Sequence, residues 1–155
     1  MPSLSASRQA QMYPAARRLV RMASDVGATP IFFLTWGHRD GWPEHHIADY
    51  SSMQVAIDQA YLAIAREQHT AVAPVGYAWW TLVGQEAQPG LWQDDGSHPT
   101  PKGTYLAACV FYATIFGASP EGLRYHGTVP GDEAARLQTL AAHTVLGDPL
   151  AWGLR

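Results

Sequence analysis

The stretch TPIFFLTWG, residues 29–37, gives the clearest indication of the fold class of this chain. It is a short apolar and aromatic run between Pro30 and Gly37, without the polar alternation that a half-buried strand shows. Such a run is typical of a strand buried on both faces, as in a parallel sheet, and it predicts a strand over residues 31–36. A second run of this kind, TAVAPVGYAWW (residues 70–80), predicts another short strand near residues 71–75.

Helical patterns precede each predicted strand. Apolar residues recur at helical spacing from Met12 to Val26, and Gly27 supplies a left-handed C-terminal cap. Pro14 predicts that the regular helix begins there, so that residues 5–13 form a lead-in turn. A second apolar stripe runs to about Glu67, and an S-x-x-Q capping box at residues 51–54 marks its start. The alternation of helix and strand predicts an α/β fold wound on a parallel sheet.

The rest of the chain combines a long connection with further helices. Residues 76–100 are predicted to form a long loop, which in a compact domain is usually functional. Thr100 is a good N-cap and Pro101 suits the first helical position, so an apolar helix is expected from there to about Phe116. A last helix is predicted over residues 132–146, with Gly147 at its end.

Composition narrows the class of protein. The length of 155 residues favours one domain, residues 1–155, and an apolar fraction of 47% is enough to form a core. A net charge of −3 offers no basic surface, so no nucleic-acid partner is expected. No run approaches the roughly 18 apolar residues of a membrane span. The single cysteine, Cys109, excludes an internal disulfide and is interpreted as a small buried hydrophobe.

Two predicted strands are too few for the burial that their sequences indicate. A pair of parallel strands cannot cover its own edges, nor bury Phe32 and Phe33 from both sides. Either part of a larger domain is missing from this chain, or copies of the chain complete the sheet. We therefore expect self-association through an uncovered sheet edge when the chain is alone.

Asp95 and His98 are candidates for acid–base chemistry. A neutral imidazole can accept a proton from a nucleophile when a carboxylate holds its other ring nitrogen. An Asp and a His three residues apart in a tight turn can supply both groups, with Gly96 relieving the bend and Pro99 stiffening the exit. Because a D-x-x-H pattern also arises by chance, an ordinary solvated turn is the alternative interpretation.

The residues around this turn carry a resemblance. DGSHPTPKGTYLAACVFYATIFGASP (residues 95–120) resembles the closing block of the SGNH/GDSL hydrolases, where D-x-x-H-P is followed by a small residue, a Gly and an apolar helix. The matching residues are Asp95, His98, Pro99 and Gly103, and FFLTWGHRDGWP and VAPVGYAWW resemble later strands of that family. The resemblance covers about residues 12–120. It implies a flavodoxin-like three-layer α/β/α sandwich with a parallel sheet, His98 as general base, Asp95 as its orienting carboxylate, and no cofactor.

Other blocks of that family have no counterpart in the sequence. The family places its nucleophile in a Gly-(Asp/Asn)-Ser block after the first strand, and draws oxyanion-hole donors from that Ser, a Gly and an Asn. None of the serines lies in such a block, and the chain contains no Asn. The sequence thus resembles the C-terminal portion of such a domain, incomplete at its N-terminus, in agreement with the strand count.

The segment after the first predicted strand is a candidate substrate site. Parallel α/β sheets build their sites at the carboxyl ends of strands, so Trp36, His38, Arg39 and Asp40 are predicted to bind substrate. The alternative is a surface loop whose tryptophans pack inward. Histidines and acidic residues at positions 38–46 also suggest a metal, but glycine and proline replace a helical i,i+4 frame of ligands, and no metal is expected.

These inferences combine into one functional expectation. We expect a serine ester hydrolase of SGNH/GDSL type that acts on an acyl or acetyl ester of a small molecule or carbohydrate, although this chain alone lacks the nucleophile. The alternative is a non-catalytic α/β fragment that serves as a binding or assembly module. The start MPSLSASRQAQ lacks the apolar segment of a signal peptide, so a cytoplasmic location is the default. Because an export signal would precede Met1 in a C-terminal portion, the location is left open.

Overall fold

β1 (Ile31–Phe33) and β2 (Ala71–Ala73) form a two-stranded parallel sheet in the computed structural model of the chain, which describes residues 4–154. Ile31 pairs with Ala71 and Phe33 with Ala73. The parallel pairing confirms the α/β class, and both strands are shorter than the sequence predicted.

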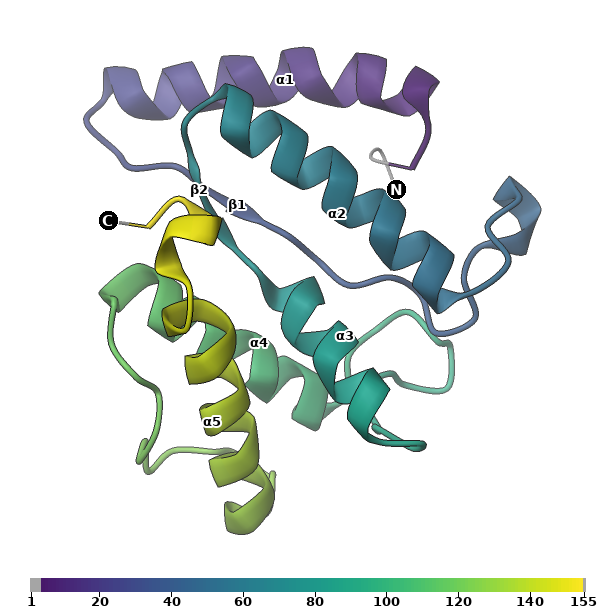
Figure 1. Cartoon of the computed structure of the whole chain (residues 1–155), viewed down its shortest axis with the longest axis vertical. Coiled ribbons are helices and arrows are strands. Elements are labelled where there is room, and N and C mark those ends of the chain that lie inside the picture. The colour runs from purple at the N-terminus through teal and green to yellow at the C-terminus, as the bar shows by residue number, and fades with distance from the viewer. Residues whose placement is uncertain (1–3, 155) are drawn as a thin grey trace.

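The other elements described are helical (Figure 1). In chain order they are α1 (Ala6–Asp25), the 3-10 helix η1 (Pro43–His45), α2 (Tyr50–Glu67), α3 (Val75–Gln85), α4 (Pro101–Phe116), α5 (Gly131–Leu146) and the 3-10 helix η2 (Pro149–Trp152). None of the helices in the described part of the chain is long and apolar enough to cross a membrane.

Helices lie on both faces of the small sheet. Phe32 meets Tyr61 of α2 edge to face, with ring centroids 6.5 Å apart. Phe33, the next residue, meets Phe111 of α4 at 5.0 Å. Because successive side chains of a strand point to opposite faces, α2 and α4 cover opposite sides of β1.

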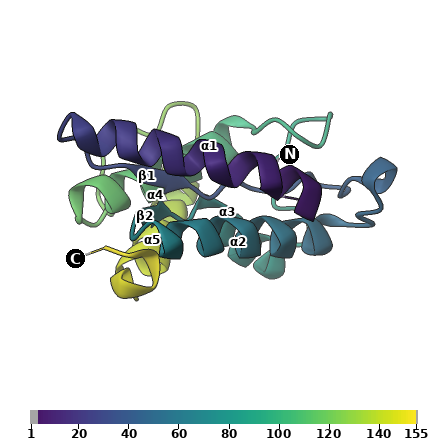
Figure 2. The same ribbon diagram turned by 90° about the horizontal axis from the view of Figure 1, so that it is seen from above.

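The main core lies among α3, α4 and α5, where Trp79, Leu106, Val110 and Ala141 are fully buried. In contrast, α1 lies outside this core and runs beside α2 (Figure 2). The hydroxyl of Tyr13 donates to the carbonyl of Ala60 at 3.2 Å. The described part of the chain therefore has a well-packed half and a lightly supported N-terminal helix.

The predicted start of the first helix was wrong. Helix α1 begins at Ala6, because the Ser5 hydroxyl caps it by accepting the backbone N–H of Arg8 at 3.3 Å. Pro14 lies inside the helix on an exposed side. The Ser5 cap already stabilises the first turn, so the one hydrogen bond that Pro14 removes does not end the helix.

Two further predictions about helices also need correction. The capping box at residues 51–54 is not formed, because the N-cap of α2 lies two residues earlier, at Asp49, whose side chain accepts the backbone N–H of Ser52 at 2.7 Å. The segment predicted as one long loop begins with α3, whose residues Val75, Ala78, Trp79 and Leu82 are buried at helical spacing. The continuous apolar run hid this period.

The predicted helices at residues 101–116 and 132–146 are confirmed, the first with Thr100 as its cap.

Candidate functional site

Asp95 and His98 form a carboxylate–imidazole pair within one tight turn. Oδ2 of Asp95 lies 2.6 Å from Nδ1 of His98. The second carboxylate oxygen, Oδ1, accepts the backbone N–H groups of Ser97 at 2.8 Å and of His98 at 2.9 Å. Since Nδ1 is engaged by the carboxylate, Nε2 is the ring nitrogen left to accept a proton.

The surroundings keep Asp95 ionised. Hydrogen bonds lower its pKa to about 2, first those from the backbone N–H groups of Ser97 and His98 and then that from the His98 ring. The side chain of His98 is 73% exposed and that of Asp95 49% exposed. An exposed pair contributes little to stability, so the effect of the carboxylate is to orient the ring.

Gly96 allows the turn to close against the segment after β1. Its φ angle is +68°, in the left-handed region, and a Cβ atom there would lie 3.3 Å from Oδ2 of Asp40 and 3.4 Å from Nη2 of Arg39. A side chain would therefore be strained by the backbone and crowded by its neighbours.

Hydrogen bonds attach the turn to the carboxyl end of β1. The indole N–H of Trp36 donates to the Ser97 carbonyl at 3.0 Å, and the backbone N–H of Arg39 donates to the Gly96 carbonyl at 2.8 Å. The Asp95–His98 turn therefore lies beside the exit of β1.

Packed tryptophan rings support the Asp95–His98 turn. Trp36 stacks on Trp79, with ring centroids 4.2 Å apart and planes 6° from parallel. Trp92 meets Trp79 edge to face at 5.1 Å and donates its indole N–H to the carbonyl of Gly37 at 3.0 Å. Trp36, predicted to bind substrate, is thus engaged in packing and in holding the loop. A contact with substrate stays a prediction.

The other three predicted substrate residues also lie beside the turn. Arg39 forms an ion pair with Asp40 at 3.1 Å and donates to the carbonyl of Asp94 at 3.3 Å. His38 is half-buried, and burial lowers its pKa while the charge of Asp95 opposes this change. The structure brings His38, Arg39 and Asp40 together with Asp95 and His98, and their role in binding substrate stays a prediction.

A cavity of about 390 Å³ lies next to this cluster. Its lining includes Arg39, which contacts the turn, and Trp92, which contacts the supporting Trp79. Tyr50 and residues 86–91 line it as well. Its size is within the range of small-molecule pockets. A larger groove, between α1 and β1, has a different set of lining residues.

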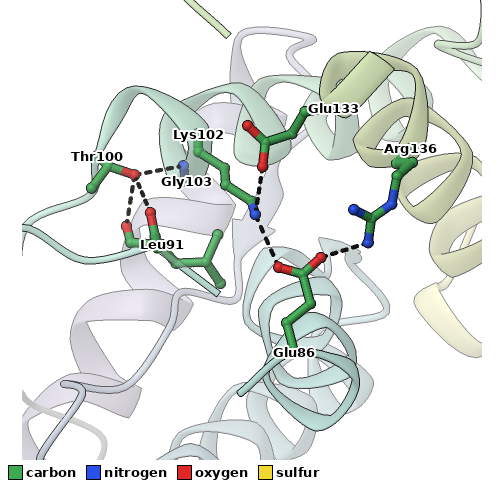
Figure 3. Close-up of polar contacts among 8 residues, drawn as sticks. Glu86, Leu91, Thr100, Lys102, Gly103, Glu133 and Arg136 are labelled. Carbon is green, nitrogen blue, oxygen red and sulfur yellow. Dashed lines mark hydrogen bonds and ion pairs between the residues drawn. The ribbon is translucent and has the colours of Figure 1, made fainter. Parts of the chain in front are cut away.

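The helix behind the turn is anchored at its first residues (Figure 3). The Thr100 hydroxyl accepts the backbone N–H of Gly103 at 3.2 Å and donates to the carbonyl of Gly90 at 2.7 Å. An added Cβ atom on Gly103 would lie 2.6 Å from the carbonyl oxygen of Leu91, so the loop and α4 approach closely there.

Ion pairs tie the same end of α4 to its neighbours (Figure 3). Nζ of Lys102 lies 2.7 Å from Glu133 of α5 and 3.0 Å from Glu86, directly after α3. Arg136 pairs with the other Glu86 oxygen at 2.5 Å. Although burial raises the pKa of Glu86, the hydrogen bonds from Lys102 and Arg136 bring it below its usual value. Three helices are thereby joined at the N-terminal end of α4.

Gln54 was missed as a residue that shapes the site. Fully buried on α2, it accepts the backbone N–H of Gly37 at 2.8 Å and donates to the carbonyl of Thr35 at 3.2 Å and to Asp58 at 2.7 Å. It thus holds the chain between β1 and Arg39. The signal in the sequence was a polar residue within the apolar stripe of the helix, which the capping-box interpretation concealed.

A nucleophile next to His98 is not found in residues 4–154. Ser97 is adjacent in sequence, but its backbone groups bind Asp95 and Trp36, and no hydrogen bond links a serine hydroxyl to the His98 ring. Ser3 lies outside the described residues. Over the same residues, no three His, Cys, Asp or Glu side chains gather as a metal ion would require.

Comparisons with known proteins bear on the fold. No protein-family model matches the chain, and no curated protein matches it significantly. Among solved structures, it is similar to the crystal structure of a DUF4886 family protein from Bacteroides uniformis, with a TM-score of 0.70 and 17% sequence identity. The match covers 88% of this chain and 57% of that chain. At this identity the likeness supports the α/β fold alone.

Proposed function

We propose that this chain is the base-bearing part of a serine ester hydrolase of SGNH/GDSL type. The observation that carries the proposal is the 2.6 Å contact between Asp95 and His98, in a turn that is attached to the exit of β1 and leads directly into α4. Helices α2 and α4 on opposite faces of a parallel sheet are what a three-layer α/β/α sandwich of that family requires.

In this mechanism, Nε2 of His98 takes the proton of a serine hydroxyl as the serine oxygen attacks the ester carbonyl. The ionised Asp95 stabilises the imidazolium that forms. His98 then gives the proton to the departing alkoxide, which leaves an acyl-enzyme. Water attacks the acyl-enzyme with His98 again as base, and the carboxylic acid and free serine result.

The serine and the oxyanion-hole donors come, in this proposal, from polypeptide other than the described residues. The exposure of the His98 ring fits a base whose nucleophile belongs to another segment. We place part of the ester in the cavity beside Arg39 and Trp92, where the guanidinium group faces polar parts of the substrate and the indole ring its apolar parts.

Labelling with a fluorophosphonate probe tests the proposal, because the probe reacts with an activated serine hydroxyl. The 155-residue chain should remain unlabelled, and a chain extended by upstream coding sequence that includes a Gly-(Asp/Asn)-Ser block should be labelled at that serine. Stoichiometric labelling of the unextended chain would show that the nucleophile is among its own serines. An extended chain that stays unlabelled would favour the binding or assembly module.

A further inference from the structure

Arg39 binds the residues on both sides of Asp95. Its backbone N–H donates to the carbonyl of Gly96 at 2.8 Å, and Nη2 of its guanidinium group donates to the carbonyl of Asp94 at 3.3 Å. A single residue thus holds the carbonyl groups that precede and follow the carboxylate in the chain. The segment that carries Asp95 is thereby fixed relative to the exit of β1.

Asp40 sets the direction of that guanidinium group. Its Oδ2 lies 3.2 Å from Nε and 3.1 Å from Nη2 of Arg39. Two N–H groups on one oxygen orient the planar fork, which the compact ammonium of a lysine could not reproduce. Because the side chains of Arg39 and Asp40 are 45% and 76% exposed, their ion pair adds little to stability. The pair acts instead by placing the hydrogen-bond donors of Arg39 against the turn.

The Asp95–His98 turn packs directly on Arg39 and Asp40. A Cβ atom on Gly96 would lie 3.4 Å from Nη2 and 3.5 Å from Cβ of Arg39, and 3.3 Å from Oδ2 of Asp40. Both the stem and the head of the arginine therefore meet the turn. A change in the Arg39 side chain reaches the turn without any intermediate residue.

Arg39 also faces the cavity of about 390 Å³ beside the turn. The contacts with Asp40 and Asp94 use Nε and Nη2, and Nη1 takes no part in them. Nη1 can therefore bind a polar part of the substrate while Nη2 holds the turn. One planar group connects the cavity to the carboxylate–imidazole pair.

We propose that Arg39 is a positioning residue for the Asp95–His98 pair. This inference rests on the proposed function, in which Asp95 holds Nδ1 of His98 so that Nε2 can take a proton. The carboxylate selects the tautomer with the proton on Nδ1, because the contact made by one ring nitrogen determines which nitrogen is protonated. Without the guanidinium group, the Asp94 end of the turn loses its contact and the carboxylate no longer stays aligned with Nδ1. The ring then populates both tautomers.

Nitrogen NMR of the His98 ring in the 155-residue chain tests this inference without any turnover. Arg39→Met removes the guanidinium donors and keeps an unbranched stem. Arg66→Met makes the same change at an exposed arginine in the last turn of α2. The neutral ring of wild type should carry its proton on Nδ1. In Arg39→Met the ratio of the Nε2–H to the Nδ1–H form should rise by about fivefold or more, as the loss of one net hydrogen bond allows.

The Arg66→Met control should keep the wild-type ratio. Both variants should melt within about 3 °C of wild type, because each removed group is exposed. An unchanged ratio in Arg39→Met would overturn the inference. An equal change in Arg66→Met, or a wild-type ring without a preferred tautomer, would overturn it as well.

Kinetics of the extended chain supply a second readout. In Arg39→Met, kcat for a small activated ester should fall by about tenfold or more, because the base is misplaced before the substrate arrives. A residue that only binds substrate would raise KM and leave kcat unchanged, and that pattern would overturn the positioning role. If the extended chain shows no turnover at all, the proposed function fails. The tautomer ratio then still decides whether Arg39 positions the pair.

Discussion

The indole N–H of Trp36 lies 3.0 Å from the carbonyl oxygen of Ser97, and this contact joins the exit of β1 to the Asp95–His98 turn. Trp36 is in turn fixed by stacking on the buried Trp79. The turn that carries the exposed Asp–His pair is therefore supported by an aromatic stack that reaches into the core.

Replacing Trp36 by Phe should loosen the turn. The variant keeps an aromatic ring but loses the N–H, so the unfolding free energy should fall by about 1 kcal/mol and the Ser97 and His98 amides should exchange faster. Trp152→Phe is the matched control, because it removes an indole N–H that donates to Thr144, in another part of the fold. If both variants changed exchange at the turn equally, the contact would have no specific role.

Gln54 should be far more sensitive to substitution than a surface glutamine of the same helix. Gln54→Leu leaves the Gly37 N–H and the Thr35 carbonyl without their partner, which should cost about 2–4 kcal/mol of unfolding free energy. Gln59→Leu on the exposed side should cost less than about 0.5 kcal/mol. Urea denaturation measures both, and similar values would contradict the role given to Gln54.

Asp58 should make stability depend on pH. Burial raises its pKa to about 6, although the hydrogen bond from Gln54 opposes this change. The folded protein then holds the Asp58 proton more tightly than the unfolded chain does. The protonated carboxyl therefore adds to the unfolding free energy below about pH 4, and this stabilisation is lost as the pH rises to about 6. Asp58→Asn should remove that loss and be more stable than wild type at pH 7, by on the order of 1 kcal/mol.

The difference in unfolding free energy between wild type and Asp58→Asn reports on Asp58 alone. Carboxylates whose pKa is lowered, such as Asp95, titrate in both proteins and cancel in this difference. Thermal melts across pH 4–7 should show the two proteins diverging as the pH rises. A constant difference over that range would show that Asp58 titrates normally.

Local signals predicted part of this structure well. Thr100 followed by Pro101 marks the start of α4 because capping and the fixed φ of proline act within one turn of chain. The Asp95–His98 pair was predictable for the same reason, since residues three apart in a turn meet without help from the rest of the fold.

Signals that depend on tertiary contacts were misread. Ser51 and Gln54 match a capping box, yet Asp49 caps the helix and Gln54 turns inward to the chain after β1, 17 residues away. Helix α3 was missed because its exposed residues Tyr77 and Trp80 are aromatic as well, so no polar face reveals the helical period. The role of Trp36 as a support was also invisible, because its partners Trp79 and Ser97 are distant in sequence.

Turnover of an ester by the extended chain tests directly whether His98 acts as the general base of a serine hydrolase. In the extended chain that carries the serine block, kcat/KM for a small activated ester is compared between wild type, His98→Ala and the surface control His143→Ala. We expect a loss of about 10³-fold or more for His98→Ala and a loss no larger for Asp95→Asn, because the imidazole then remains with poorer orientation. His143→Ala should show no loss. Full activity of His98→Ala, with the variant correctly folded, would contradict the claim.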